Sequence, residues 1–142
     1  MLAVVVAGGC GGSGGGSGKR LSPTDYAAKA DALCIKYHEK TKSIGRARNL
    51  KEVADAFDRA LPILDKALTD IRRLKPPANE QPAVNRWLAQ SEVLKGDLTK
   101  MRDRARANDL KGVRATFTRA VSDARRANQS AAWLGMKVCS KG

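Results

Sequence analysis

The side chains able to carry chemistry in this sequence are few: three cysteines and one histidine. Cys34 and His38 lie four residues apart, a spacing that would put two soft-metal ligands on one face of a helix. One thiol and one imidazole make only half of a metal site, and the sequence offers no second pair. The only glycine tract is typical of a tether and not of a phosphate-binding loop. We therefore expect a protein without catalytic residues, metal or cofactor, which binds and does not catalyse.

Cys10 stands at the centre of a segment whose composition differs from the rest of the chain. A short apolar run over residues 2–7 precedes it, and only glycine and serine follow it as far as Gly18. This order resembles the lipoprotein signal peptides of bacteria, which are cleaved directly before a cysteine whose thiol carries a diacylglycerol. The resemblance implies a signal peptide over residues 1–9 and lipidation of Cys10. Because Gly/Ser chain buries no apolar area, residues 10–21 are expected to form a disordered, lipidated tether.

Two features of this segment depart from the lipoprotein pattern. Ala7 stands where leucine is usual, and no lysine or arginine precedes Lys19. A true start upstream of Met1, supplying the basic segment, would explain the second departure. The alternative interpretation is a Gly/Ser linker or leftover leader in which Cys10 is unmodified.

Cys34 and Cys139 remain as an even pair, 105 residues apart. Neither belongs to a CxxC or haem-attachment motif. An exported domain sits in an oxidising compartment, where two remaining thiols usually pair. The sequence therefore predicts a disulfide between Cys34 and Cys139. The fourth helix must overshoot or the tail must fold back for the two to meet, and the sequence leaves both routes open.

The second unusual feature is charge: 27 Lys and Arg against 14 Asp and Glu give a net charge of +13. Residues 95–126 contain ten basic residues and four acidic ones. Such a field attracts anionic lipid headgroups, wall polymers or nucleic acid. Nucleic acid is the disfavoured partner, because aromatics are only 4% and no binding motif is present. The candidate polyanion-contacting residues are Arg102, Arg104, Arg106, Arg114, Arg119, Arg125 and Arg126.

The elements that position these residues are predicted to be four helices in one domain over residues 22–142. Few aromatics and an apolar spacing of three and four residues favour helix over strand. Ser22 caps the first helix, which ends at Gly45, and Asn49 caps the second. Pro62 is expected to kink the second helix, and Pro76-Pro77 ends it.

The third helix is expected to begin within residues 79–83, and Asn108-Asp109 turns the chain into the fourth, which ends at Gly135. Helices of similar length with short connections favour an up-down-up-down four-helix bundle, an all-α fold. The predicted buried stripe of the fourth helix is Leu110, Val113, Phe117, Val121, Ala124, Ala131 and Leu134.

An internal repeat suggests that the bundle is a duplicated helical hairpin. Residues 50–61 match residues 110–121 at Leu, Lys, Val, Phe, Arg and Ala, with an offset of 60. The alternative is that Ala-rich amphipathic helices resemble one another by chance.

The folded segment resembles the small Ala-rich helical lipoproteins of high-GC Gram-positive bacteria. Ala30-Asp31-Ala32-Leu33-Cys34, Leu74-Lys75-Pro76-Pro77 and Leu134-Gly135-Met136-Lys137-Val138-Cys139 carry the likeness. The resemblance implies a disulfide between the two cysteines and a tethered extracytoplasmic domain. It supplies no catalytic residue.

Together these observations predict a lipoprotein on the outer face of the cytoplasmic membrane, held there through Cys10, whose bundle binds an unidentified partner. Anionic lipid headgroups and wall polymers are the anions that surround a protein at this location. Two other functions remain open. One is a basic helical protein that binds nucleic acid or another polyanion, and the other is a carrier for a small apolar ligand between the helices.

Overall fold

The computed structural model describes residues 18–142, so the predicted signal peptide, Cys10 and most of the tether lie outside the described residues. Four helices make up the fold: α1 (Pro23–Thr41), α2 (Leu50–Arg72), α3 (Gln81–Arg106) and α4 (Leu110–Trp133). Two short 3₁₀ turns, η1 (Lys42–Ile44) and η2 (Cys139–Lys141), follow α1 and end the chain. No strand occurs in this part of the chain.

The helix ends follow local signals in the sequence. The side chains of Ser22, Asn49 and Asp109 each accept a hydrogen bond from a backbone N–H in the first turn of the next helix. Gly135 adopts a φ of 79° just after α4, the left-handed conformation that ends a helix and that glycine adopts without strain. The prediction that the first helix ends at Gly45 is wrong by four residues: α1 ends at Thr41, and Gly45 ends the 3₁₀ turn η1 that follows it. The second helix is continuous through Pro62.

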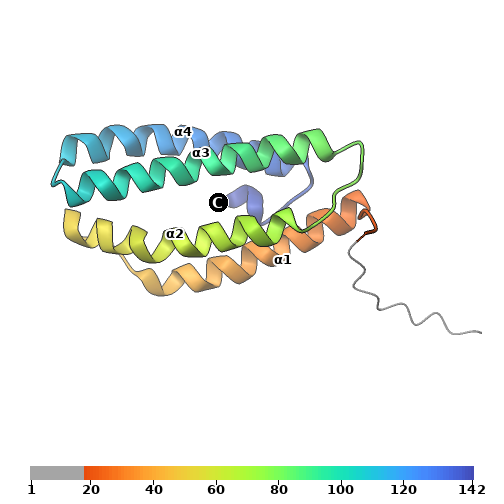
Figure 1. Cartoon of the computed structure of the whole chain (residues 1–142), viewed down its shortest axis with the longest axis horizontal. Coiled ribbons are helices and arrows are strands. Elements are labelled where there is room, and N and C mark those ends of the chain that lie inside the picture. The colour runs from red at the N-terminus through yellow and green to blue at the C-terminus, as the bar shows by residue number, and fades with distance from the viewer. Residues whose placement is uncertain (1–17) are drawn as a thin grey trace, which may run out of the picture.

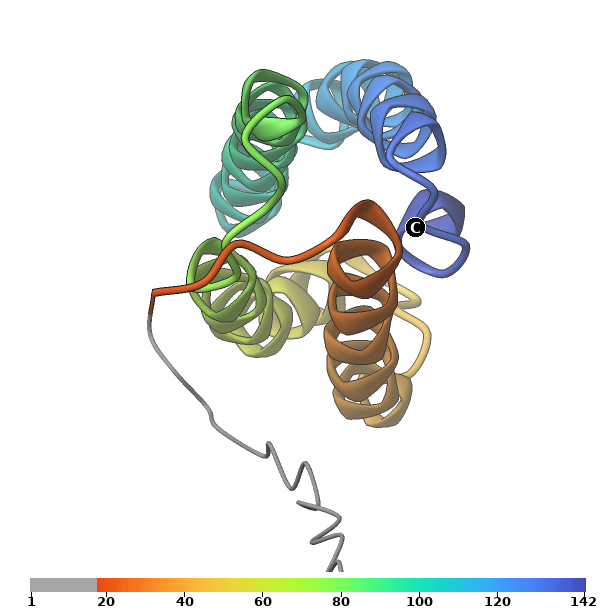
Figure 2. The same ribbon diagram turned by 90° about the vertical axis from the view of Figure 1, so that its right-hand side faces the viewer.

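The four helices form an up-down-up-down bundle, which confirms the predicted all-α fold (Figures 1 and 2). α1 packs on α2, α2 on α3 and α3 on α4, but α1 and α4 make no comparable contact. The chain turns back after α4, and η2 lies between α4 and α1 (Figure 2). The tail therefore fills the gap between α1 and α4, which we call the seam.

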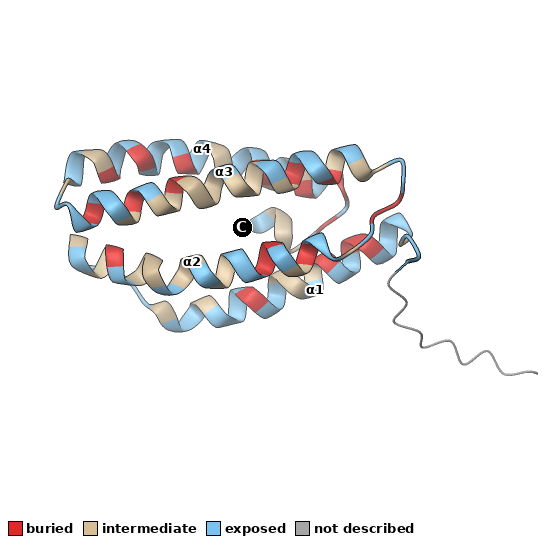
Figure 3. Cartoon of the chain, viewed as in Figure 1, coloured by how far each residue is buried: buried red, intermediate tan, exposed pale blue. Residues whose placement is uncertain are grey.

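The core is divided between the two ends of the bundle (Figure 3). At the end where α1 begins, the C-terminal tail fills the seam, and we call this end the clasped half. Its buried cluster is Tyr26, Ala27, Ala30, Ile71, Val84, Trp87, Ala127, Ala131, Leu134 and Met136. The other end, which we call the groove half, has a smaller buried cluster of Ala54, Met101, Ala105, Val113 and Ala120.

The predicted buried stripe of α4 is wrong in part. Val113, Ala131 and Leu134 are buried, whereas Leu110, Phe117 and Val121 are exposed. The buried face of α4 instead continues through Thr116, Ala120 and Ala127. The apolar arc of α4 is wide enough to cover two neighbours, but only α3 packs along its length, so the side turned toward the seam stays open.

None of the helices within residues 18–142 is both long enough and apolar enough to span a membrane.

Candidate functional site

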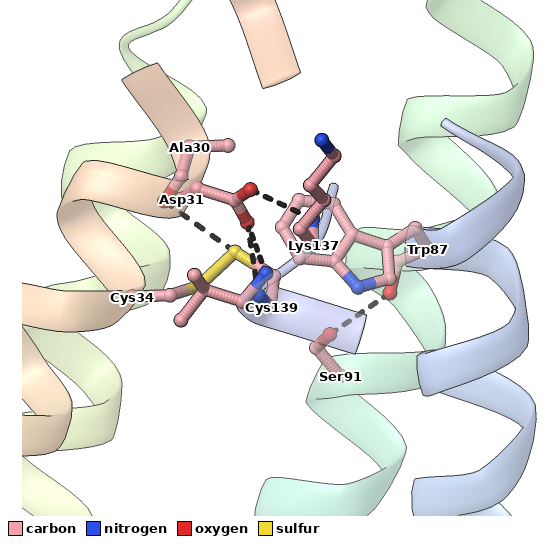
Figure 4. The surroundings of a disulfide bond; sticks show 8 residues. Ala30, Asp31, Cys34, Trp87, Ser91, Lys137 and Cys139 are labelled. Carbon is pink, nitrogen blue, oxygen red and sulfur yellow. Dashed lines mark hydrogen bonds between the residues drawn. A yellow bond between two sulfur atoms is a disulfide. The ribbon is translucent and has the colours of Figure 1, made fainter. Parts of the chain in front are cut away.

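The C-terminal tail is fixed by a disulfide between Cys34 and Cys139, as predicted (Figure 4). The two Cα atoms are 5.5 Å apart. α4 ends at Trp133, and the tail folds back to reach Cys34, which settles the route that the sequence left open. Because Cys34 is used in the disulfide and His38 is exposed, the half metal site does not form. Within residues 18–142 no three His, Cys, Asp or Glu side chains converge on a metal position.

A second contact fixes the tail and was missed from the sequence. Asp31 accepts three backbone N–H groups: Oδ2 from Lys137 at 2.7 Å, and Oδ1 from Val138 at 2.9 Å and Cys139 at 3.0 Å (Figure 4). A carboxylate facing consecutive N–H groups makes charge-assisted hydrogen bonds and caps the turn η2. The available signal was its position, one turn before Cys34 on the same helix. We call residues 136–142, the disulfide and Asp31 together the C-terminal clasp.

Most of the arginines predicted to contact a polyanion lie beside carboxylates of the chain itself. Arg104 pairs with Asp109 at 3.0 Å, and Arg106 pairs with Asp58 at 2.6 Å. The other ion pairs of this set join Arg102 to Asp103 and Asp58, Arg119 to Asp97, and Arg126 to Asp123. Their positive charge is therefore compensated locally.

Arg119 holds the one buried carboxylate among these pairs. Asp97 on α3 is 2% exposed, and Arg119 Nε lies 3.2 Å from its Oδ1. Asp97 Oδ2 is buried without a hydrogen-bond partner among the described residues. An unpaired buried carboxylate costs folding free energy. The main role of Arg119 is therefore to pair with Asp97 and so stabilise the contact between α3 and α4.

Arg114 and Arg125 differ from the other five, since neither has a carboxylate within ion-pair distance in residues 18–142. Arg125 borders a shallow hollow near Ser140. Arg114 borders a groove in the groove half. The structure thus separates the seven predicted arginines into five with partners in the chain and two without, and it does not bring them together.

The groove occupies the groove half, between the α1–α2 connection, α2 and α4. It has a volume of about 480 Å³, within the range of small-molecule sites. Met101 of α3 is among its lining residues, and Phe57 and Phe117 line it from α2 and α4. The remaining lining residues are Gly45, Ala47, Val53, Ala56, Val113, Arg114 and Thr118.

The groove lining carries positive charge and no negative charge. Arg114 is the only charged residue that lines it, and no acidic residue does. Lys111, one helical turn before Arg114, and Arg46, between two lining residues, are exposed. On the α2 side, Asp55 and Asp58 adjoin lining residues and pair with Lys51 and Arg106. An apolar groove whose one charged lining residue is a cation favours a ligand that has an apolar body and a negative charge.

α1 leaves the groove open because its second half is bound to α2. The Tyr37 hydroxyl donates a hydrogen bond to Asp70 on α2. This hydrogen bond lowers the pKa of Asp70, with the charges of Lys66, Lys36 and Arg73 adding to the effect. The same bond raises the pKa of Tyr37. Held in this way against α2, α1 does not lie along the groove-half end of α4.

Sequence reasoning missed the groove because it assigned Phe117 to the core. Phe117 is 57% exposed, and Val121, one turn further, is exposed too. The usable signal was the width of the apolar arc on α4, which exceeds what one neighbouring helix covers. No family model, curated protein or solved structure matches the chain.

Proposed function

We propose that this protein is a lipoprotein held on the outer face of the cytoplasmic membrane through Cys10, with a helical bundle that binds a ligand or partner and performs no catalysis. The observation that supports it most is the disulfide. Cys34 and Cys139 pair with each other, which leaves Cys10 as the one cysteine without a partner. Disulfides persist in oxidising compartments, so a disulfide-locked domain fits an exported protein.

The membrane attachment has two parts in this proposal. A single acyl chain holds a protein weakly, whereas two chains, or one chain with a basic patch, hold it firmly. A diacylglycerol on Cys10, carrying fatty acids such as palmitate, beside a domain in a chain of net charge +13 supplies both. Anionic lipid headgroups and wall polymers are the surrounding anions.

The test is intact mass and fractionation of the native chain and of Cys10→Ser. The native protein should partition with membranes and carry the mass of a diacylglycerol on a new N-terminal Cys10. Cys10→Ser should be released, or keep its leader. The Cys34→Ser/Cys139→Ser double variant is the matched control, because it removes two thiols and should leave the anchor in place. A processed Cys10→Ser protein that stays on the membrane contradicts the proposal.

The groove supports a more specific function for the bundle: a carrier for a small anionic amphiphile. The Phe57, Met101 and Phe117 side chains offer the apolar surface, and Arg114 offers the one charged contact. A fatty-acid-like ligand would bury its chain on the former and place its carboxylate at the latter. Burial of the chain supplies most of the binding free energy, and Arg114 selects the sign of the headgroup.

Dodecanoate and dodecylamine test this function, because they share a chain and differ in charge. Each is titrated against the full-length protein with bound anilinonaphthalene sulfonate, an apolar anionic dye whose fluorescence falls on displacement. We expect dodecanoate to displace the dye at lower concentration than dodecylamine. Arg114→Gln should abolish that preference, and Phe117→Ala should weaken both ligands.

The controls are Arg86→Gln and Val93→Ala, which alter an exposed cation and an exposed apolar side chain on α3, outside the groove lining. Both should bind as the native protein does. Equal affinity for the two ligands, or equal loss in Val93→Ala and Phe117→Ala, would reject the groove as the site.

A further inference from the structure

One end of the bundle combines an exposed tryptophan with cations that form no ion pair within residues 18–142. This end, which we call the tether pole, comprises residues 18–29, 74–86 and 132–137. It includes the start of α1, the α2–α3 connection and the end of α4 (Figure 1). Trp133 is 72% exposed there, the highest value among the large apolar side chains of the described chain. Trp133 borders a hollow together with Pro23 and Thr24 of α1, so α4 and α1 meet at this pole.

Exposed tryptophan is unusual on a soluble surface and typical of a membrane interface. Its ring buries apolar area in the acyl region while its N–H stays with polar headgroups. Trp133 has no role in either buried cluster, in contrast to Trp87, which is 4% exposed in the clasped half. Packing inside the bundle therefore does not explain Trp133.

The charge of the tether pole complements an anionic surface. Its two acidic residues are Asp25 and Glu80. All of its cations are exposed, and none pairs with a carboxylate within residues 18–142: Lys19, Arg20, Lys29, Lys75, Arg86 and Lys137. A basic surface of this size is attracted to anionic lipid by about 1 kcal/mol for each cation close to it.

The chain enters the structure at the same pole, and its entry is fixed. Arg20 donates hydrogen bonds to the Pro76 carbonyl at 2.9 Å and to Gln81 Oε1 at 3.0 Å. The Leu21 N–H donates to the Lys75 carbonyl at 2.8 Å. These contacts hold the segment before α1 on the α2–α3 connection.

The length of the tether limits which part of the bundle can reach the membrane. Gly18 is eight residues after Cys10 in the sequence, and eight such steps span at most about 28 Å when extended. α4 has 24 residues and is about 36 Å long. An anchor on Cys10 therefore keeps the tether pole near the bilayer and does not let the groove half approach it end-on.

We propose that the tether pole lies against an anionic bilayer, with Trp133 among the lipid headgroups and the cations on lipid phosphates. The orientation rests on the lipid anchor of the proposed function. It places the groove half at the outer end of the bundle, open to ligands from outside the membrane.

The experiment uses the full chain with Cys10→Ser, so that no lipid is attached, mixed with vesicles of phosphatidylglycerol or of phosphatidylcholine. Tryptophan emission and co-sedimentation are measured together. Because Trp87 is already buried, a blue shift of the emission reports on Trp133. We expect a blue shift and sedimentation with phosphatidylglycerol, both reversed by salt, and neither with phosphatidylcholine. Heparin, a soluble polyanion, should cause no blue shift.

Three variants in this background locate the contact, with sedimentation as the readout. Trp133→Ala should weaken partitioning about tenfold, and Lys137→Gln about fivefold. Phe117→Ala, which removes an exposed ring at the opposite end, should not change it. Vesicle binding without a blue shift, or equal binding by Trp133→Ala and its parent, overturns the proposal. Either result leaves the mass of lipidated Cys10 unaffected, so failure here is distinguishable from failure of the anchor.

Discussion

The side of the bundle between α1 and α4 is closed differently at its two ends. In the clasped half, the tail lies between the helices and buries Met136 beside Tyr26 and Trp87. In the groove half no segment of residues 18–142 takes that place, and Phe117 is left exposed on α4. The buried cluster of the clasped half contains the rings of Tyr26 and Trp87, whereas that of the groove half consists of alanine, valine and methionine.

Under the proposed function, this difference separates the part of the domain that stabilises the fold from the part that binds a ligand. Binding sites are commonly drawn from the less densely packed parts of a protein, because a site must exchange solvent for ligand. The clasp concentrates covalent and hydrogen-bonded constraints at one end, so the other end is able to remain open. The following changes test whether the two ends are as independent as this comparison implies.

Removal of the disulfide should have the largest effect. Cys34→Ser with Cys139→Ser opens a loop of 105 residues, and the loop-entropy argument gives a loss of about 4–5 kcal/mol in the free energy of unfolding. Denaturant unfolding measures this loss when the double variant is compared with the native chain. Cys10→Ser is the control and should leave the free energy of unfolding unchanged. A loss below about 1 kcal/mol would mean that the tail is held mainly by other contacts.

Asp31→Asn should have the next largest effect. The amide loses the negative charge and keeps one oxygen for the three N–H groups of Lys137, Val138 and Cys139. We expect a loss of about 2–3 kcal/mol in unfolding free energy. Asp55→Asn, which breaks an exposed pair with Lys51, is the control and should leave the free energy of unfolding nearly unchanged.

The same substitution, Asp31→Asn, can also be made in the Cys34→Ser/Cys139→Ser variant, which shows whether Asp31 acts through the tail. If Asp31 acts only through the tail, Asp31→Asn should cost much less once Cys34 and Cys139 are serines, because the two changes share one contact. Full additivity of the two losses would show that Asp31 stabilises α1 independently of the tail.

The helix ends were predictable from sequence because each depends on a few neighbouring residues. The side chains of Ser22, Asn49 and Asp109 cap the helices that follow them, and Gly135 ends α4 for an equally local reason. The end of α1 at Thr41 was missed, because the 3₁₀ turn η1 separates it from Gly45. The pairing of Cys34 with Cys139 was also predictable, since exclusion of Cys10 left only one pair.

The groove and the arginine partners were not predictable in the same way. Whether Phe117 is buried depends on the position of α1, which Tyr37 and Asp70 hold against α2 from a distance in sequence. The partner of Arg106, Asp58, is 48 residues away. Helical periodicity identifies an apolar face but does not say which neighbour covers it. Lipidation of Cys10 and duplication of the hairpin stay predictions.

The alkaline titration of Tyr26 probes how dry the clasped half is. Burial raises the pKa of Tyr26 from 10.0 to about 12, and the nearby charge of Glu80 adds to the rise. Because the folded-state pKa is the higher one, the protonated phenol stabilises the fold below pH 10, and this contribution is lost as the pH rises toward 12. In Tyr37→Phe, where Tyr26 is the one tyrosine left, phenolate absorbance should rise in a single late transition. A Tyr26 transition near pH 10 would place water in the clasped half.

The smallest effect on stability is expected for Phe117→Ala. The Phe117 ring is 57% exposed, so its loss removes little buried apolar area and should change the free energy of unfolding by less than about 1 kcal/mol. Val93→Ala, at a position 55% exposed on α3, is the matched comparison. Denaturant midpoints should agree between the two variants, while only Phe117→Ala weakens the binding of dodecanoate. A loss near 3 kcal/mol, as for truncation of a packed core ring, would mean that α1 closes over the groove in solution. The two halves would then be equally packed, and the groove would carry no ligand.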